Sequence, residues 1–73
     1  MELGEALAVV LKKERKDKNL SQEELAFRCD LDRTYISLLE RGLRQPTLAV
    51  IFKICNALET STSSFIKKIE ALL

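Results

Sequence analysis

The amino-acid sequence predicts an all-α fold, a compact five-helix bundle formed by a single domain over residues 1–73. Apolar residues recur at helical spacings, and no strand-like alternation of apolar and polar residues persists anywhere. Gly and Pro are scarce, at two and one of the 73 residues. Apolar residues make up 47% of the chain and charged residues 32%, which is typical of a folded domain rather than a disordered chain.

The first predicted helix covers residues 2–18. Leu7 and Leu11 lie on one helix face, and Arg15 continues this apolar stripe four residues further on. Glu40 continues the apolar stripe of a later predicted helix in the same way. Both charges are therefore expected to face inward, where an ion pair between Arg15 and Glu40 would compensate them.

Two short helices with start signals of their own follow. Ser21 and Glu24 have the spacing of a capping box, and this helix extends to about Cys29. Asp32 is expected to cap the next helix, which ends at Gly42, the residue best suited to a left-handed position after a helix. Two capped helices separated by about three residues cross at a large angle, so the sequence predicts a helix-turn-helix. Hydrophobic staples are expected at the two helix starts, from Leu20 with Leu25 and from Leu31 with Ile36.

The remaining chain is expected to form two further helices, and it carries more apolar side chains than one small core can hold. Thr47 is placed to cap the fourth helix, and the last helix begins near Ser61. A domain of this size often buries apolar surface in a partner subunit, so a homodimer with a C-terminal dimerisation helix is expected. The apolar stripe of the fourth helix is predicted at Leu48, Ile51, Cys55 and Leu58. The predicted dimer interface consists of Phe52, Phe65, Ile66, Ile69 and Leu72.

Composition and charge argue against several classes of protein. The formal net charge is only +1, so binding of nucleic acid by bulk attraction is not indicated. With no His and two Cys, no metal site or cofactor is expected, and no nucleophile has an adjacent base, so an enzyme is not indicated. Cys29 and Cys55 could form a disulfide, but buried thiols in a reducing cytosol are favoured. The sequence shows no signal peptide and no apolar run of about 18 residues, and a cytoplasmic location is expected.

The first turn of the third helix carries the candidate DNA-reading side chains. Arg33 has the donor fork that matches the O6 and N7 acceptors of guanine. Thr34 offers a methyl group to thymine and a hydroxyl to a base edge or a phosphate, and Tyr35 could bind the sugar-phosphate chain. The alternative is a solvated helix face. A Tyr expected to be exposed beside Arg33 and Thr34 favours DNA contact.

Other polar residues could fix the position of the protein on a duplex. Gln22 lies in the first turn of the second helix, where free N–H groups attract a phosphate, although an ordinary exposed residue is the alternative. Arg44 and Gln45 could contact DNA from the loop after the third helix, or form only a flexible basic loop. A weaker hypothesis makes Glu23 part of an acidic patch that contacts RNA polymerase during activation, with the sigma subunit as the partner.

The motifs resemble a known family of DNA-binding proteins. Residues 20–26 (LSQEELA) and residues 46–48 (PTL), with Ile36, Leu39, Glu40 and Gly42 between them, resemble the Cro/CI-type (XRE) helix-turn-helix family over about residues 7–66. The segment 31–37 (LDRTYIS), followed by Glu40 and Arg41, is similar to the controller proteins of bacterial restriction–modification systems.

This resemblance implies a lambda-repressor-like DNA-binding domain that acts as a homodimer on pseudo-palindromic operators. Such a controller activates its own gene and the restriction gene and later represses them. By position, Arg33 would read a base, Thr34, Tyr35 and Ser37 would support base and backbone contacts, and Arg44 would touch the operator from its loop.

Two other functions and one departure from the family pattern stay open. The chain could be a phage- or plasmid-type XRE repressor or an antitoxin, or a helical protein-interaction module that uses the same fold without DNA. Many family members have Gly after the fourth helix, whereas this chain has Glu59, so that helix end is expected to differ.

Overall fold

The five expected helices are present in the computed structural model, which describes residues 1–73. No strand occurs, so the predicted all-α fold is confirmed. The helices are α1 (Leu3–Asp17), α2 (Gln22–Cys29), α3 (Arg33–Glu40), α4 (Leu48–Ala57) and α5 (Thr62–Glu70).

Side-chain caps begin three of these helices, and those at Ser21 and Thr47 were expected. The Ser21 hydroxyl accepts a hydrogen bond from the Glu24 N–H (3.0 Å), and the Glu24 carboxylate accepts one from the Ser21 N–H (2.9 Å). The bond from the Ser21 backbone lowers the pKa of Glu24. Thr47 and Ser61 each accept a bond from the N–H three residues on, at 3.2 and 3.1 Å. The prediction for Asp32 is wrong in part, because it occupies the N-cap position but its side chain makes no capping bond.

The end of α3 closes in the way that the position of Gly42 predicts. Gly42 has a φ of +71°, which is the left-handed conformation. The N–H of Leu43 then donates to the carbonyl of Leu38 at 3.0 Å, which satisfies a carbonyl that the last turn leaves free. The loop after α3 therefore starts in a defined direction.

The end of α4 has the same left-handed residue and closing hydrogen bond as the end of α3, although the left-handed residue is Glu59 rather than a Gly. Glu59 has a φ of +56°, and the N–H of Thr60 donates to the carbonyl of Cys55 at 3.0 Å. The expectation of a different helix end is therefore wrong. Hydrogen bonding outweighs the cost of placing a side chain with a Cβ in the left-handed region.

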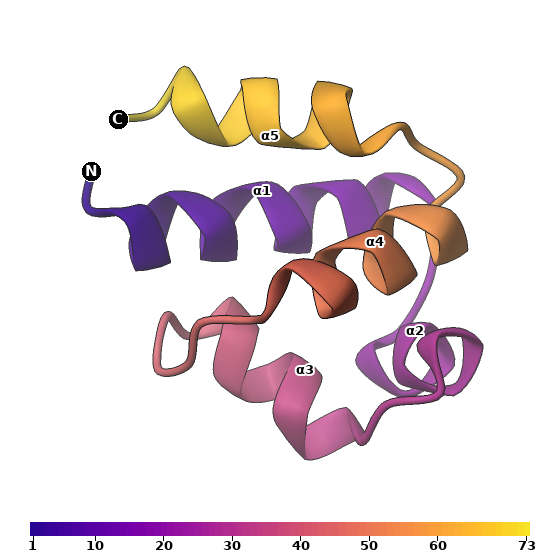
Figure 1. The fold of residues 1–73 in the computed structure, drawn as a ribbon. Helices are drawn as coiled ribbons and strands as arrows, with labels where there is room; N and C mark the ends of the chain where they lie inside the picture. The colour runs from indigo at the N-terminus through magenta and orange to yellow at the C-terminus, as the bar shows by residue number, and fades with distance from the viewer.

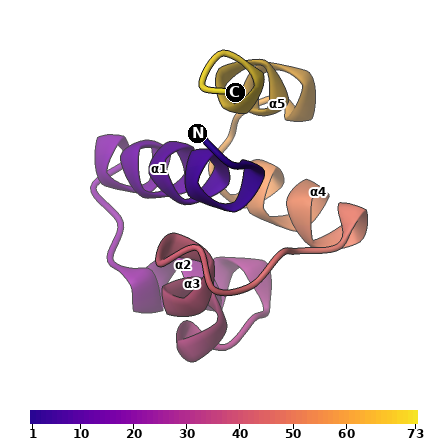
Figure 2. The same ribbon diagram turned by 90° about the vertical axis from the view of Figure 1, so that its left-hand side faces the viewer.

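The helices form three tiers, which are clearest in the two ribbon views. Helices α1 and α5 run antiparallel side by side, and α4 crosses below α1 (Figure 1). Helices α2 and α3 form the tier farthest from α5 (Figure 2). Helix α1 packs on α3 and α5, α2 packs on α3 and α4, and α4 also packs on α5, so α1 lies between α3 and α5. The largest fully buried side chains are Phe65, Leu11, Leu25, Ile36, Leu39, Ile54, Leu58 and Cys55.

Four apolar residues do not lie where the sequence predicts. Leu48 was expected in the buried stripe of α4 but is 69% exposed, while Ile54, outside that stripe, is fully buried. Phe65 and Ile69 were expected at a dimer interface but are only 0% and 5% exposed. A core closed on both sides of α1 has room for both side chains, so neither leaves a surface for a partner.

Cys29 and Cys55 are both buried and free, so the favoured interpretation as thiols matches the structure. Burial raises the pKa of both thiols, which keeps them protonated at neutral pH. No helix has the length and apolar character needed to cross a membrane.

The Glu59→Gly variant is expected to be more stable than the native chain by about 1 kcal/mol, because glycine adopts the left-handed conformation without a steric penalty. The same substitution at the helical Glu23 should instead reduce stability by about 0.5–1 kcal/mol. Urea denaturation measures both values. A loss of stability in Glu59→Gly would show that the left-handed residue carries no strain.

Candidate nucleic-acid interface

The first turn of α3 is held by the core while its outer side chains stay free. Ile36 and Leu39 are fully buried and anchor the helix. Arg33 and Thr34 are exposed at its N-terminus, and neither side chain forms a hydrogen bond or an ion pair with the rest of the chain. The structure therefore places a guanidinium and a hydroxyl on a rigid support, available to a ligand.

Tyr35 differs from the sequence-based expectation. It is half-buried and packs against the hydrophobic core, so the expectation of a fully exposed ring is wrong. Its ring lies below the side chain of Arg44, whose guanidinium carbon is 5.6 Å from the ring centroid. Arg44 and Gln45 are exposed in the loop after α3, and Ser37 is half-buried on that helix. We call Arg33, Thr34, Tyr35, Ser37, Arg44 and Gln45 the α3 face.

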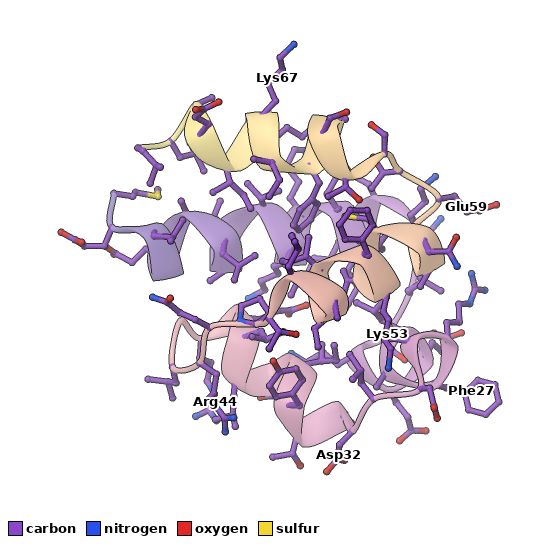
Figure 3. The ribbon with its side chains drawn as sticks, viewed as in Figure 1. Phe27, Asp32, Arg44, Lys53, Glu59 and Lys67 are labelled. Atoms are coloured by element: carbon purple, nitrogen blue, oxygen red, sulfur yellow. The ribbon has the colours of Figure 1, made fainter.

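The α3 face lies at one end of the molecule. Arg44 and Asp32 project there, and Lys67 projects from α5 at the opposite end (Figure 3). Arg41 is also exposed at the end of α3, while Glu23 and Glu24 are exposed on α2. The charge is therefore mixed, and the α3 face carries two cations, Arg33 and Arg44, rather than a continuous basic surface.

Beside the α3 face, the predicted ion pair between Arg15 and Glu40 is present and nearly buried. Arg15 Nε and Nη2 donate to the two carboxylate oxygens of Glu40, at 2.6 and 2.9 Å. The two side chains are only 9% and 3% exposed. The hydrogen bond to Glu40 raises the pKa of Arg15, so the guanidinium stays charged at any physiological pH.

Two further groups complete this network. Arg15 Nη1 donates to the Leu20 carbonyl at 2.7 Å, and the Gln22 amide donates to Glu40 Oε1 at 3.1 Å. The network links α1, the start of α2 and the end of α3, and it leaves no buried side-chain polar atom without a partner. Gln22 is thus no ordinary exposed helix-start residue, while its contact with a phosphate stays a prediction.

The sequence-based reasoning missed two features. The Leu20 carbonyl has no side-chain signal, because any residue supplies the same backbone group. Phe27 could have been found, since it follows the buried Leu25 and Ala26 at a position that turns away from the core. It is 87% exposed, and it projects from α2 away from the core (Figure 3).

Comparison with known proteins identifies the family. The sequence profile described as Helix-turn-helix matches residues 11–65, which is most of the chain. The chain belongs to this XRE-type family. It is 46% identical over 61 residues to control protein C.MunI of Mycoplasma sp, and the match spans 82% of each chain. It is 62% identical over 40 residues to control protein C.BamHI of Bacillus amyloliquefaciens, which spans 55% of this chain but only 49% of that protein.

Solved structures share the fold. The restriction–modification controller protein C.Esp1396I, solved as a tetramer in complex with its natural 35 base-pair operator, is 40% identical with a TM-score of 0.84, and the match covers 94% of this chain and 96% of that one. The clp gene regulator ClgR from Corynebacterium glutamicum is 30% identical with a TM-score of 0.92, over 97% of this chain and 76% of that one. The fold alone therefore does not separate controllers from other regulators.

The Glu40→Ala variant is expected to lose about 3–5 kcal/mol of stability, because it leaves Arg15 charged and unpaired in a buried position. The exposed pair of Lys13 and Asp17 is the matched control, since its side chains are 73% and 56% exposed and Lys13→Ala should cost at most about 1 kcal/mol. Chemical denaturation measures both. Equal losses in the two variants would contradict a structural role for the buried pair.

Proposed function

We propose that this protein is a sequence-specific DNA-binding transcription regulator, a controller of restriction–modification gene expression. The observation that carries the proposal is the α3 face, where Arg33 and Thr34 are unpaired at the exposed N-terminus of a rigidly held helix. The N-terminal residues of the second helix of a helix-turn-helix are those that contact base edges in the major groove. Similarity to control proteins, and to a controller solved with its operator, supports this proposal.

Each group of the α3 face has a task that suits its chemistry. Arg33 donates its two N–H groups to the O6 and N7 of a guanine, which specifies a base. Thr34, Tyr35 and Ser37 support base and backbone contacts. Arg44 and Gln45 reach the duplex from the loop, and phosphate contacts of this kind fix the register without reading sequence. Gln22 adds one such contact at the start of α2.

A homodimer would place two α3 faces on one duplex, with half-sites about 34 Å apart. The apolar surface that supports it is smaller than predicted from sequence, because only Phe52, Ile66 and Leu72 of the predicted set retain exposed area. Leu48 and Leu73 add to it, at 69% and 63% exposed. A groove of about 280 Å³ lies on this side between the starts of α1 and α4 and the flank of α5 that carries Ile66, and it is lined mostly by apolar side chains.

Activation requires contact with the transcription machinery, and α2 offers a surface for it. Glu23, Glu24, Phe27 and Arg28 line one exposed depression. Carboxylates around an exposed aromatic ring suit a partner surface that combines basic and apolar side chains, and RNA polymerase, through its sigma subunit, is the partner we propose.

In run-off transcription, the Glu23→Lys variant should lose activation while its operator affinity is retained. Parallel loss of both would contradict a polymerase contact.

Two competing functions are separable by simple observations. A phage- or plasmid-type repressor or an antitoxin shares the fold and the DNA contacts, and a neighbouring methyltransferase and endonuclease gene would favour the controller. A helical interaction module would bind no DNA sequence selectively. Similarity to a controller solved with its operator supports the DNA-binding function over that module.

The Arg33→Ala variant tests the proposed function. Binding to a duplex that the native protein selects from a random-sequence pool should weaken by about 1–3 kcal/mol, with relaxed preference at one base pair. Lys67→Ala, at the opposite end of the molecule, is the control and should bind like the native protein (Figure 3). Fluorescence anisotropy measures both affinities. Uniform weakening on all sequences would make Arg33 a phosphate contact, and no sequence selection by the native chain would overturn the proposal.

The Phe52→Lys variant tests the dimer. Placing a charge in the exposed apolar surface should shift the protein to monomers, because a lysine ammonium is costly to bury without a partner. Phe27→Lys is the matched control, since it changes another exposed Phe on α2 and should leave the dimer intact. Sedimentation velocity at tens of micromolar distinguishes the two states. A native chain that sediments as a monomer would contradict the dimer.

A further inference from the structure

Arg44 and Tyr35 belong to different elements and yet lie against each other. The distance of 5.6 Å between the Arg44 guanidinium carbon and the Tyr35 ring centroid is within the range, about 6 Å, at which an aromatic face attracts a cation. No carboxylate forms an ion pair with Arg44, since the three ion pairs of the chain involve other residues. The ring is thus the group that holds this guanidinium.

The ring is a rigid support. Tyr35 is half-buried, packs against the core and precedes the fully buried Ile36. The loop that carries Arg44 is also restrained at both ends, by the bond from the Leu43 N–H to α3 and by the Thr47 cap of α4. A restrained loop and a fixed ring together limit the positions open to the Arg44 side chain.

We propose that Tyr35 is a positioning residue for Arg44, whose guanidinium it holds stacked at the α3 face before DNA arrives. This inference rests on the proposed function. A guanidinium stacked on a ring keeps its N–H edge free, and that edge donates two parallel bonds to a phosphate or a guanine. Stacking orders the side chain in advance, so less conformational entropy is lost when the contact forms. The ring thus has a role separate from any bond made by its hydroxyl.

A double-mutant cycle tests the role of the ring. Arg44→Ala is combined with Tyr35→Phe, which keeps the ring, and with Tyr35→Leu, which removes it. Each protein is then titrated with the duplex that the native protein selects from the random-sequence pool. The factor by which Arg44→Ala weakens binding should be the same in the native and Tyr35→Phe backgrounds, and smaller by about two- to five-fold in Tyr35→Leu. The control is Arg41→Ala, in the same segment but without a ring contact. It should weaken binding by the same factor in the native, Tyr35→Phe and Tyr35→Leu backgrounds. Equal factors for Arg44→Ala would overturn the proposal.

NMR of the free protein provides a readout that is independent of DNA. The chain has one Tyr, no Trp and three Phe, so a ring-current shift of the Arg44 side-chain protons is assigned to Tyr35 by its loss when that ring is removed. The upfield shift should persist in Tyr35→Phe and disappear in Tyr35→Leu, whose folding is verified by its thermal melt. Absence of the shift in a native protein that selects DNA overturns only the positioning role. Failure to select any duplex overturns the proposed function, and this role of Arg44 with it.

Discussion

The buried ion pair of Arg15 and Glu40 connects α1 to the helix that carries the α3 face. Two bonds join the side chains, and a third ties Arg15 to the backbone at the start of α2. Apolar packing alone would hold α3 against α1 but would permit small rotations about its axis. The forked guanidinium of Arg15 permits far fewer rotations, because each of its N–H groups must point at its acceptor. Such an ion pair is a better device for orientation than for stability, since its desolvation offsets most of its attraction.

Much of the helix architecture could be predicted from the sequence because the chain encodes it locally. A capping box at Ser21 and a left-handed glycine at Gly42 act within a few residues, and both form as expected. The ion pair was also predictable, since a charge in phase with an apolar stripe must face inward. The expectations failed where the outcome depends on the assembled fold. Phe65 was assigned to a partner subunit because a list of apolar residues does not show how much volume five packed helices enclose.

In the candidate site, too, the locally encoded features were predictable, and those that depend on the assembled fold were not. Arg33 and Thr34 are free, as expected, because Ile36 and Leu39 turn a different face of the helix toward the core. The burial of Tyr35 and its contact with Arg44 depend on the path of a loop, which periodicity does not describe. With a net charge of +1, the chain attracts DNA weakly at long range, so a few well-placed donors must supply most of the affinity. Orientation of those donors matters more in such a protein than in a strongly basic one.

The position of α1 between α3 and α5 has a consequence for the newly made chain. Lys68 of α5 reaches Glu14 of α1, 54 residues earlier, and α5 covers one side of α1 there. Synthesis makes α1 before α5, so α1 stays without this cover until α5 has also emerged. A chain interrupted before α5 would expose apolar surface and become a substrate for proteolysis. Quality control of the cell would therefore remove chains that lack α5, and chains that contain this helix would make up the active pool.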